Sequence, residues 1–153
     1  MRLTNCPIIE PNLNKPYTYR TPKTDEKGDS IPVKDDRGEQ LKDPQGNLLW
    51  EAESHDWTLF DVWLKLVGQR SVEHWVGDDL SLFFKVSNAL RRRVESGKPV
   101  AEQLVEVKGE TYKWMRSQLE NAMKGAKEIT VELASAVLAG FDGCKADEAE
   151  GEI

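Results

Sequence analysis

Proline is unevenly distributed along this 153-residue chain, and its distribution constrains the fold more than any other feature. All but one of the seven prolines lie in the first 56 residues, at Pro7, Pro11, Pro16, Pro22, Pro32 and Pro44. Proline fixes φ and lacks the backbone N–H, so residues 1–56 cannot contain a long helix. The chain is therefore expected to join a turn-rich N-terminal segment to a remainder of different structure.

Glycines in residues 1–56 recur in turn-like settings, in Lys27-Gly28-Asp29, Arg37-Gly38-Glu39 and Gln45-Gly46-Asn47. Short apolar stretches lie between these turns, which predicts a weak β-ribbon. The alternative is an extended arm that becomes ordered only on binding, because few large apolar side chains are available to offset the loss of chain entropy. No internal repeat is identified, and whether this segment is ordered alone stays open.

Residues 57–142 carry the periodicity of helices. The expected helices are Leu59–Val67, Asp78 or Asp79 to about Glu95, Glu110–Lys124 and Thr130–Gly140, with an extended segment at 103–107. Thr58 is the expected N-cap of the first helix, with Asp61 at its third position. The predicted fold class is α+β: a mainly helical C-terminal bundle of about four helices, preceded by the ribbon or arm. Residues 143–153 are predicted to be an acidic disordered tail.

Charge separates the same three regions. Residues 1–56 contain 8 Lys and Arg against 11 Asp and Glu, and residues 57–142 contain 12 of each kind. Residues 143–153 contain 1 Lys against 4 Asp and Glu. The net charge of -6 disfavours a protein whose whole surface binds nucleic acid, because phosphate binding needs excess cations. No apolar run is long enough to span a membrane, and no signal-peptide pattern is present. A cytoplasmic location is therefore expected.

Catalytic and metal-binding motifs are absent from the sequence, including phosphate-binding glycine loops. His55 and His74 each stand beside an acid, but neighbours in sequence do not generally face each other, so neither forms a dyad. Cys6 and Cys144 lie near opposite ends of the chain. They could form one bridge, yet a reducing cytoplasm fits the sequence better. We expect no enzyme, no metal and no cofactor.

Tryptophan is unusually frequent for a small domain, with five in the chain. Trp75 and Trp114 lie off the expected core stripes, and an exposed tryptophan is a typical interface anchor. The alternative places both at the edge of the core, with their N–H groups reaching water. Leu59–Val67 is apolar on most sides, so it is either central to the core or lies against a partner. The predicted partner-binding residues are Trp75, Trp114, Phe60 and Trp63.

Arg91-Arg92-Arg93 is the sharpest cationic feature. Its position near a helix C-terminus already suits the helix dipole, so a solvated helix end is one interpretation. The other is a basic patch of Lys85, Arg91, Arg92 and Lys98 that binds nucleic acid or an acidic partner.

Three motifs occur in order along the chain: Thr58-Leu59-Phe60-Asp61-Val62, Phe84-Lys85-Val86 in a charged helix that reaches Arg91, and Val105-Glu106-Val107 followed by Glu110. Over about residues 30–141 this order resembles a group of small bacteriophage and prophage proteins of mostly unassigned activity. The chain departs from that pattern at Ile129–Phe141, which lacks a small proline-led motif, and at Trp75 and Trp114, which replace aliphatic residues.

The resemblance implies a phage-encoded accessory protein and transfers no site residue. The predicted function is accordingly a non-catalytic phage-type accessory protein that binds another protein of the phage or the host, or a second copy of itself. Its task would be particle assembly or modulation of a host component. The alternative is a nucleic-acid-binding protein that uses the basic helix patch.

Overall fold

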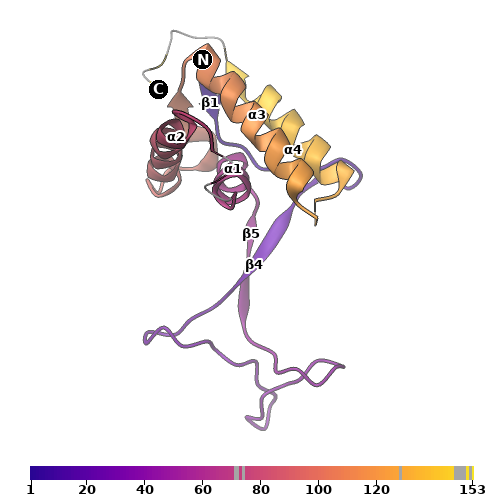
Figure 1. Cartoon of the computed structure of the whole chain (residues 1–153). Coiled ribbons are helices and arrows are strands. Elements are labelled where there is room, and N and C mark those ends of the chain that lie inside the picture. Colours follow the sequence, from indigo (N-terminus) through magenta and orange to yellow (C-terminus); the bar gives the residue numbers. More distant parts are fainter. Residues whose placement is uncertain (71–72, 74, 128, 147–150, 152) are drawn as a thin grey trace. The chain divides into compact units, whose positions relative to one another are not determined.

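The computed structural model describes residues 1–70, 73, 75–127, 129–146, 151 and 153, which form two compact units. The helical unit comprises Met1–Tyr17 and Trp57–Ile153, and the hairpin module comprises Thr18–Asp56 (Figure 1). The fold class is α+β, as predicted from the sequence. The chain divides after Asp56, where the sequence placed a boundary, but residues 1–17 belong to the helical unit and not to the arm. Leu3 and Ile8 of this segment are buried in the core of the helical unit.

The helices of the described chain agree with the predicted ones to within three residues. They are α1 (Leu59–Gly68), α2 (Asp79–Val94), α3 (Gly109–Gly125) and α4 (Val131–Gly143). Thr58 caps α1 as predicted: its Oγ1 accepts a hydrogen bond from the Asp61 N–H and donates one to Asp61 Oδ2. Thr130 Oγ1 accepts from the Leu133 N–H at the start of α4. Each cap satisfies a backbone donor that a helix leaves unpaired in its first turn.

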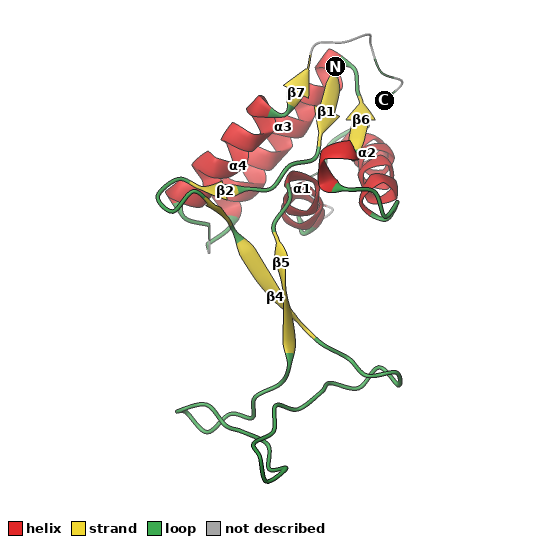
Figure 2. Ribbon diagram, turned by 180° about the vertical axis from the view of Figure 1, so that it is seen from behind, coloured by secondary structure: helices red, strands yellow, loops and turns green. Residues whose placement is uncertain are grey.

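A three-stranded antiparallel sheet with the order β6-β1-β7 lies in the helical unit (Figure 2). Its central strand is β1 (Arg2–Thr4), and β6 (Leu104–Glu106) is the segment expected to be extended, preceded by the 3₁₀ helix η2 (Val100–Glu102). The strands β2 (Ile9–Glu10) and β3 (Lys15–Pro16) form a separate short pair. Arg2 pairs with Glu106 on one side and with Ala146 on the other, so the two ends of the chain meet in one sheet.

The segment expected to be a disordered tail is ordered where it is described. Gly143 ends α4, and β7 (Lys145–Ala146) pairs with β1. The carbonyl oxygen of Ile153 accepts a hydrogen bond from the Lys108 N–H at 2.8 Å. These contacts form because the second edge of β1 offers unpaired backbone groups to a following strand. Residues 147–150 and 152 lie outside the described residues.

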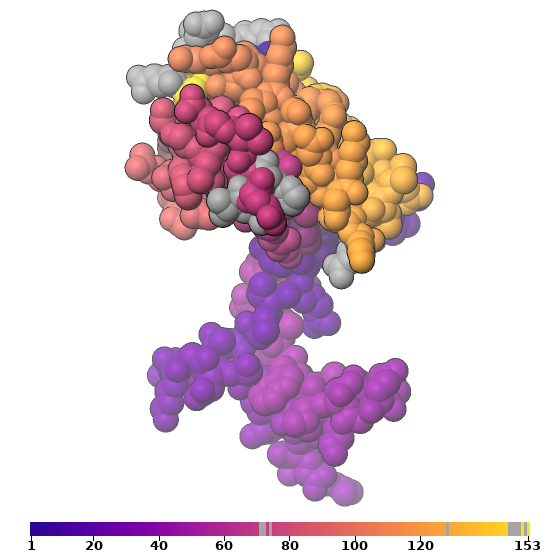
Figure 3. All heavy atoms as spheres, viewed as in Figure 1, coloured from indigo at the N-terminus to yellow at the C-terminus, as the bar shows by residue number. Residues whose placement is uncertain are grey.

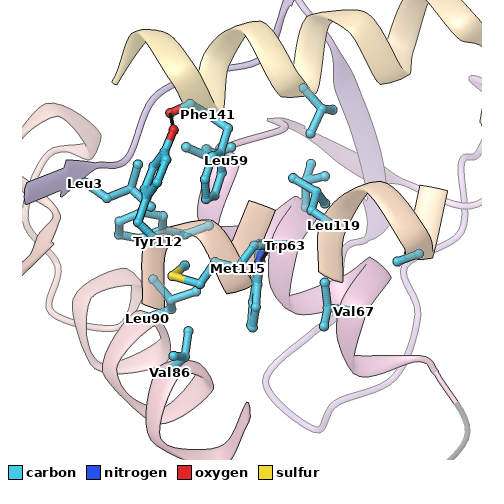
Figure 4. Close-up of a cluster of buried hydrophobic side chains, with 14 of the residues drawn as sticks. Leu3, Leu59, Trp63, Val67, Val86, Leu90, Tyr112, Met115, Leu119 and Phe141 are labelled. Atoms are coloured by element: carbon cyan, nitrogen blue, oxygen red, sulfur yellow. Dashed lines mark hydrogen bonds between the residues drawn. The ribbon is translucent and has the colours of Figure 1, made fainter. Parts of the chain in front are cut away.

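The core of the helical unit is built around α1, which packs against α2, α3 and α4. Trp63 lies among Met115, Leu119 and Val86 (Figure 4), and its Nε1 donates to the Met115 carbonyl oxygen at 3.0 Å. The surplus apolar surface of α1 is therefore covered within the chain. Phe60 and Trp63 are each 1% exposed, so both are core residues, which corrects the prediction that they contact a partner.

One face of α3 consists of buried side chains: Tyr112, Met115, Leu119 and Met123. On α4 the first apolar residue, Val131, is instead 83% exposed. Val131 opens the helix next to the cap, where the side chain points away from the packed turns, and Val137 is buried further along α4.

Asn5 is a buried polar residue that joins three segments of the helical unit. Its Oδ1 accepts hydrogen bonds from the N–H groups of Phe60 at 2.9 Å and Cys6 at 3.1 Å. Its Nδ2 donates to Gln103 Oε1 at 2.7 Å. The Asn5 N–H also donates to the Gln103 carbonyl oxygen, so strand β1 is tied both to the start of α1 and to the residue before β6.

The hairpin module begins and ends with the antiparallel strands β4 (Thr18–Pro22) and β5 (Ala52–Asp56). Between them, three hairpins are closed by single bridges, Thr24↔Ser30, Lys34↔Gln40 and Lys42↔Leu48. The three share a pattern that the sequence analysis overlooked, Asp-x-x-Gly-x-x-Ile/Leu, which starts at Asp25, Asp35 and Asp43. The module is therefore a threefold repeat of one short hairpin.

Each hairpin turn is closed in the same way. In the second hairpin, Asp35 Oδ1 accepts from the N–H groups of Arg37 at 2.9 Å and Glu39 at 3.0 Å, and the Gly38 N–H donates to the Asp35 carbonyl oxygen. Gly38 has a φ of 82°, in the left-handed region that glycine adopts without steric cost. Short aspartate side chains close turns of this kind by bonding nearby backbone N–H groups.

Two closed rings of backbone hydrogen bonds hold the hairpins together. In the first ring, the N–H of Leu41 donates to Val33, that of Leu49 to Leu41, and that of Val33 to Leu49. Lys23, Ile31 and Glu51 form the second ring in the same manner, with N–H···O distances of 2.8 to 3.3 Å. The order of the module thus rests on backbone hydrogen bonds rather than on a packed core.

Replacing Asn5 tests how far the helical unit depends on this residue. Asn5→Ala leaves the Phe60 N–H and Gln103 Oε1 buried without their partner, so we expect the unfolding free energy to fall by about 2–3 kcal/mol. Asn5→Asp keeps an acceptor for Phe60 but cannot donate to Gln103, and it also buries a charge, so a loss of at least similar size is expected. Urea denaturation measures both. Substitutions of surface residues usually change the unfolding free energy by less than about 0.5 kcal/mol. A loss no larger than this for Asn5→Ala would contradict the role given to this residue.

Replacing Asp35 tests the closure of the hairpins. Asp35→Ala removes the acceptor of two N–H groups, so amide exchange at Arg37 and Glu39 should accelerate by about fivefold, the ratio that corresponds to roughly 1 kcal/mol. Amide exchange followed by NMR reports on these two residues separately from the other hairpins. Asp36→Ala, at the exposed neighbouring residue, is the matched control, and equal acceleration in both variants would count against the closure described above.

Candidate functional site

The hairpin module contains exposed apolar side chains without a core to cover them. Residues 18–56 are all described, and none of them is buried. Leu41, Leu48, Leu49 and Trp50 are between 37% and 47% exposed. They belong to the third hairpin and to the segments on either side of it, and Trp50 forms a bridge with Pro32. In the space-filling view the hairpins stand apart as separate lobes (Figure 3). We use the term apolar face of the module for this set of four exposed residues, whichever side of the backbone each one occupies.

Acidic residues outnumber basic residues in the hairpin module. Residues 18–56 contain 6 Lys and Arg against 10 Asp and Glu. One oxygen of each turn aspartate is already used by backbone N–H groups, as Asp43 Oδ1 is by Gln45 and Asn47. The remaining carboxylates stay on a surface whose net charge is -4, the difference between those two counts, so the site combines uncovered apolar atoms with negative charge.

Sequence reasoning did not select this site. The apolar residues were recognised as parts of weak strands, and Trp50 was assigned no role in binding. The signal that would have found them is the repeated Asp-x-x-Gly, because three turns so close together leave too few apolar residues for a core.

The predicted interface residues Trp75 and Trp114 meet in the helical unit, with their ring centroids 6.2 Å apart. Both are half-buried and pack against the core together with Phe83. The Trp114 Nε1 donates to Asp79 Oδ1 at 3.1 Å, so its polar edge is satisfied within the chain rather than by water. These two residues are part of an aromatic cluster at the edge of the core, and whether a partner also touches them stays a prediction.

The aromatic cluster borders two exposed apolar residues that the sequence analysis did not select. Phe84 is 55% exposed and its ring lies 5.8 Å from that of Phe83, while Val76 is 75% exposed. The Arg70 guanidinium lies over Trp75, 5.4 Å from the centre of its ring, and donates a hydrogen bond to Gln118 Oε1. Arg70 therefore lies against one side of the aromatic cluster.

The four residues of the predicted basic patch are all exposed. Lys85 and Arg92 are seven residues apart on α2 and therefore share one face, whereas Arg91 points about 100° away from Arg92. Lys98 follows the end of the helix. Glu106 lines the groove beside Arg92, and Glu110 lines the groove beside Lys85. The cations are thus dispersed and accompanied by carboxylates, which favours a solvated helix end over a phosphate-binding surface.

The strongest cluster of titratable groups lies between α3 and α4. Asp142 accepts from Arg116 Nε at 2.9 Å and Nη2 at 3.0 Å, and from the Tyr112 hydroxyl at 2.9 Å. The hydrogen bonds from Arg116 hold the pKa of Asp142 below its usual range. Burial and the bond to Asp142 raise the pKa of Tyr112. The groups satisfy one another, so the cluster holds two helices together and offers no free acid or base.

The remaining candidates for chemistry are few. His55 Nε2 lies 2.8 Å from Thr21 Oγ1, and its ring packs against Tyr19 across β4 and β5. His74 lies outside the described residues. Within the described ranges, no three metal-ligating side chains come together. The described helices include none with the length and apolar character that crossing a bilayer requires.

Comparison with known protein families, with curated proteins and with solved structures finds no match to this chain. The resemblance to small phage and prophage proteins therefore stays a prediction.

The pKa of Asp142 leads to a pH-dependent prediction. A carboxylate whose pKa is lowered by folding stabilises the folded state above its unfolded pKa, and loses that contribution as the pH falls through its folded pKa. We expect Asp142→Asn to reduce the unfolding free energy at pH 7, and the difference from wild type to shrink as the pH falls from about 5 towards 2. Urea denaturation across this range measures the difference. Asp36→Asn is the control, and a deficit for Asp142→Asn that does not change with pH would argue against the ion pair.

Proposed function

We propose that the protein is a non-catalytic binding protein that docks on another protein through the apolar face of its hairpin module. The supporting observation is a folded segment of 39 residues, 18–56, in which no side chain is buried. Its phage-type accessory role in the cytoplasm of a host cell belongs to the same proposal and is supported only by the motif resemblance.

The energetics of so small a unit support a partner. Chains of about 40 residues or fewer usually need disulfides, metals or association to stay folded, because they bury too little apolar surface. Residues 18–56 contain no cysteine. The two hydrogen-bond rings fix the hairpins, but exchanging bonds with water for bonds within the chain brings a small net gain. A partner that covers the apolar face would supply the missing burial.

The composition of the face fits a binding hot spot. Trp50 is the kind of large, amphipathic side chain that dominates interface energetics. Leu48 and Leu49 precede it directly, and Leu41 accepts the hydrogen bond of the Leu49 N–H. The fixed backbone limits the conformational entropy that binding would cost, and this favours affinity.

The charge of the module indicates the chemistry of the partner. A surface with net charge -4 is attracted to a basic surface and repelled by a second copy of itself. We therefore expect a different protein, with an apolar patch bordered by Lys or Arg. Binding through such a contact should weaken as the salt concentration rises.

The test compares Leu48→Ala/Trp50→Ala with wild type and with Val131→Ala, an 83% exposed apolar residue of the helical unit. The substituted residues are exposed, so all three proteins should have unfolding free energies within about 0.5 kcal/mol per substitution. Affinity capture from host lysate with quantitative mass spectrometry should enrich a protein with wild type and with Val131→Ala. The double variant should lose it, and the purified pair should show binding at least about 30-fold weaker, equivalent to roughly 2 kcal/mol.

Three outcomes contradict the proposal. Retention of every captured protein by the double variant would remove the module as a binding site. Light scattering that shows a dimer in wild type and a monomer in the double variant would mean that the face binds a second copy of this chain instead. Binding to nucleic acid that is lost on Lys85→Ala/Arg92→Ala, and not in the double variant, would favour the basic patch.

A further inference from the structure

Cys6 and Cys144 are 138 residues apart in the sequence, and the sheet of the helical unit brings them together. Strand β1 pairs with β7 in the register Arg2↔Ala146 and Leu3↔Lys145. The next pair in this register is Thr4 with Cys144, and the Thr4 N–H donates to the Cys144 carbonyl oxygen at 3.0 Å. Cys6 follows two residues after Thr4, just beyond the end of β1.

One backbone carbonyl marks the meeting point of the two cysteines. The Gly140 oxygen accepts the Cys144 N–H at 3.0 Å, and the Cys6 Sγ lies 3.9 Å from the same oxygen. A Cβ at Gly140 would lie 3.6 Å from Cys6 Sγ, which is an ordinary van der Waals distance. The Cys6 sulfur therefore lies beside Gly140 in the last turns of α4.

Each of the two thiols also shifts the pKa of the other. Hydrogen bonding from Cys6 lowers the pKa of Cys144 to about 7, although burial acts in the opposite direction. The same hydrogen bond and burial raise the pKa of Cys6. Both side chains are half-buried rather than enclosed, and both are free thiols in this structure.

We infer that Cys6 and Cys144 form a dithiol site that closes to a reversible disulfide by exchange with a low-molecular-weight disulfide. From the sequence one bridge was possible, but free thiols were expected because a reducing cytoplasm fitted the sequence better. The site is independent of the proposed function, since it lies wholly within the helical unit.

The exchange proceeds in two steps. The Cys144 thiolate attacks one sulfur of the small disulfide, forms a mixed disulfide and releases one small thiolate. Cys6 then loses its proton to solvent and attacks the Cys144 sulfur, which releases the second small thiol. The two protein thiols are oxidised by two electrons, the small disulfide is reduced to two thiols, and the attacking group is the thiolate at each step.

The bridge would tie the segment after β1 to the end of α4. It would close a loop of nearly the whole chain, the hairpin module included, and long loops lose the most unfolded-state entropy on cross-linking. Oxidation should therefore stabilise the pairing of β7 with β1 and raise the thermal stability of the helical unit.

In the test, reduced wild-type protein is incubated with excess oxidised glutathione at about pH 7.5, and its intact mass is followed. At this pH a thiol with the lowered pKa of Cys144 is largely thiolate. We expect a product that is lighter by two hydrogens, with Cys6 and Cys144 peptides joined, and a Tm about 5 °C or more above that of the reduced protein. Brief alkylation of the reduced protein should label Cys144 at least about tenfold faster than Cys6, because the thiolate is the reactive form.

Two variants separate the steps without depending on a change in stability. Cys6→Ser should stop at a glutathione adduct on Cys144, since a serine hydroxyl in place of the Cys6 thiol cannot resolve the mixed disulfide. Cys144→Ser should form no intramolecular bridge. Mixed disulfides on wild type that never resolve, or a bridge that forms only in urea, would overturn the inference.

Discussion

The helical unit depends on the hydrogen bonds of the Asn5 side chain. A short strand placed between two others has to be held in register from both sides, and β1 has only three residues with which to do so. Asn5 adds side-chain hydrogen bonds to the start of α1 and to Gln103, next to β6. Gln103 in turn donates to the Lys98 carbonyl oxygen, so the network reaches the loop after α2. A buried network with every partner satisfied specifies one arrangement of these segments.

The local part of this fold was predictable from the sequence, and the long-range part was not. Helix periodicity and the Thr58 cap placed the helices because both signals lie within a few residues of each other. Leu3 and Ile8 belong to the core but lie in a segment rich in proline, where no period marks them as buried. The surplus apolar surface of α1 allowed either a core or a partner, and only the packing of α2, α3 and α4 around it decides for the core.

The candidate site shows the same division. The glycines of the hairpins were recognised as turns, because a left-handed glycine has a local signature. The aspartates three residues before them were not, although each closes its turn, and the repeat was therefore missed. The rings that join Val33, Leu41 and Leu49 are bonds between backbone groups, which all residues share. No side-chain pattern could have indicated the rings, whereas the repeated aspartate and glycine, once noticed, would have pointed to apolar residues without a core.

The two units remain folded for different physical reasons, and this determines where function can reside. In the helical unit the apolar side chains cover one another, and a substitution on its interior changes stability first. In the hairpin module, backbone hydrogen bonds fix the structure and the apolar side chains stay exposed. Truncating Trp50 or Leu48 should therefore change the unfolding free energy little. A surface whose apolar atoms are not needed for its own folding can be selected for a partner, because binding and stability are then separable at the same residues. The thiols of Cys6 and Cys144 belong to the first kind of unit, where a covalent bond would strengthen contacts that already exist.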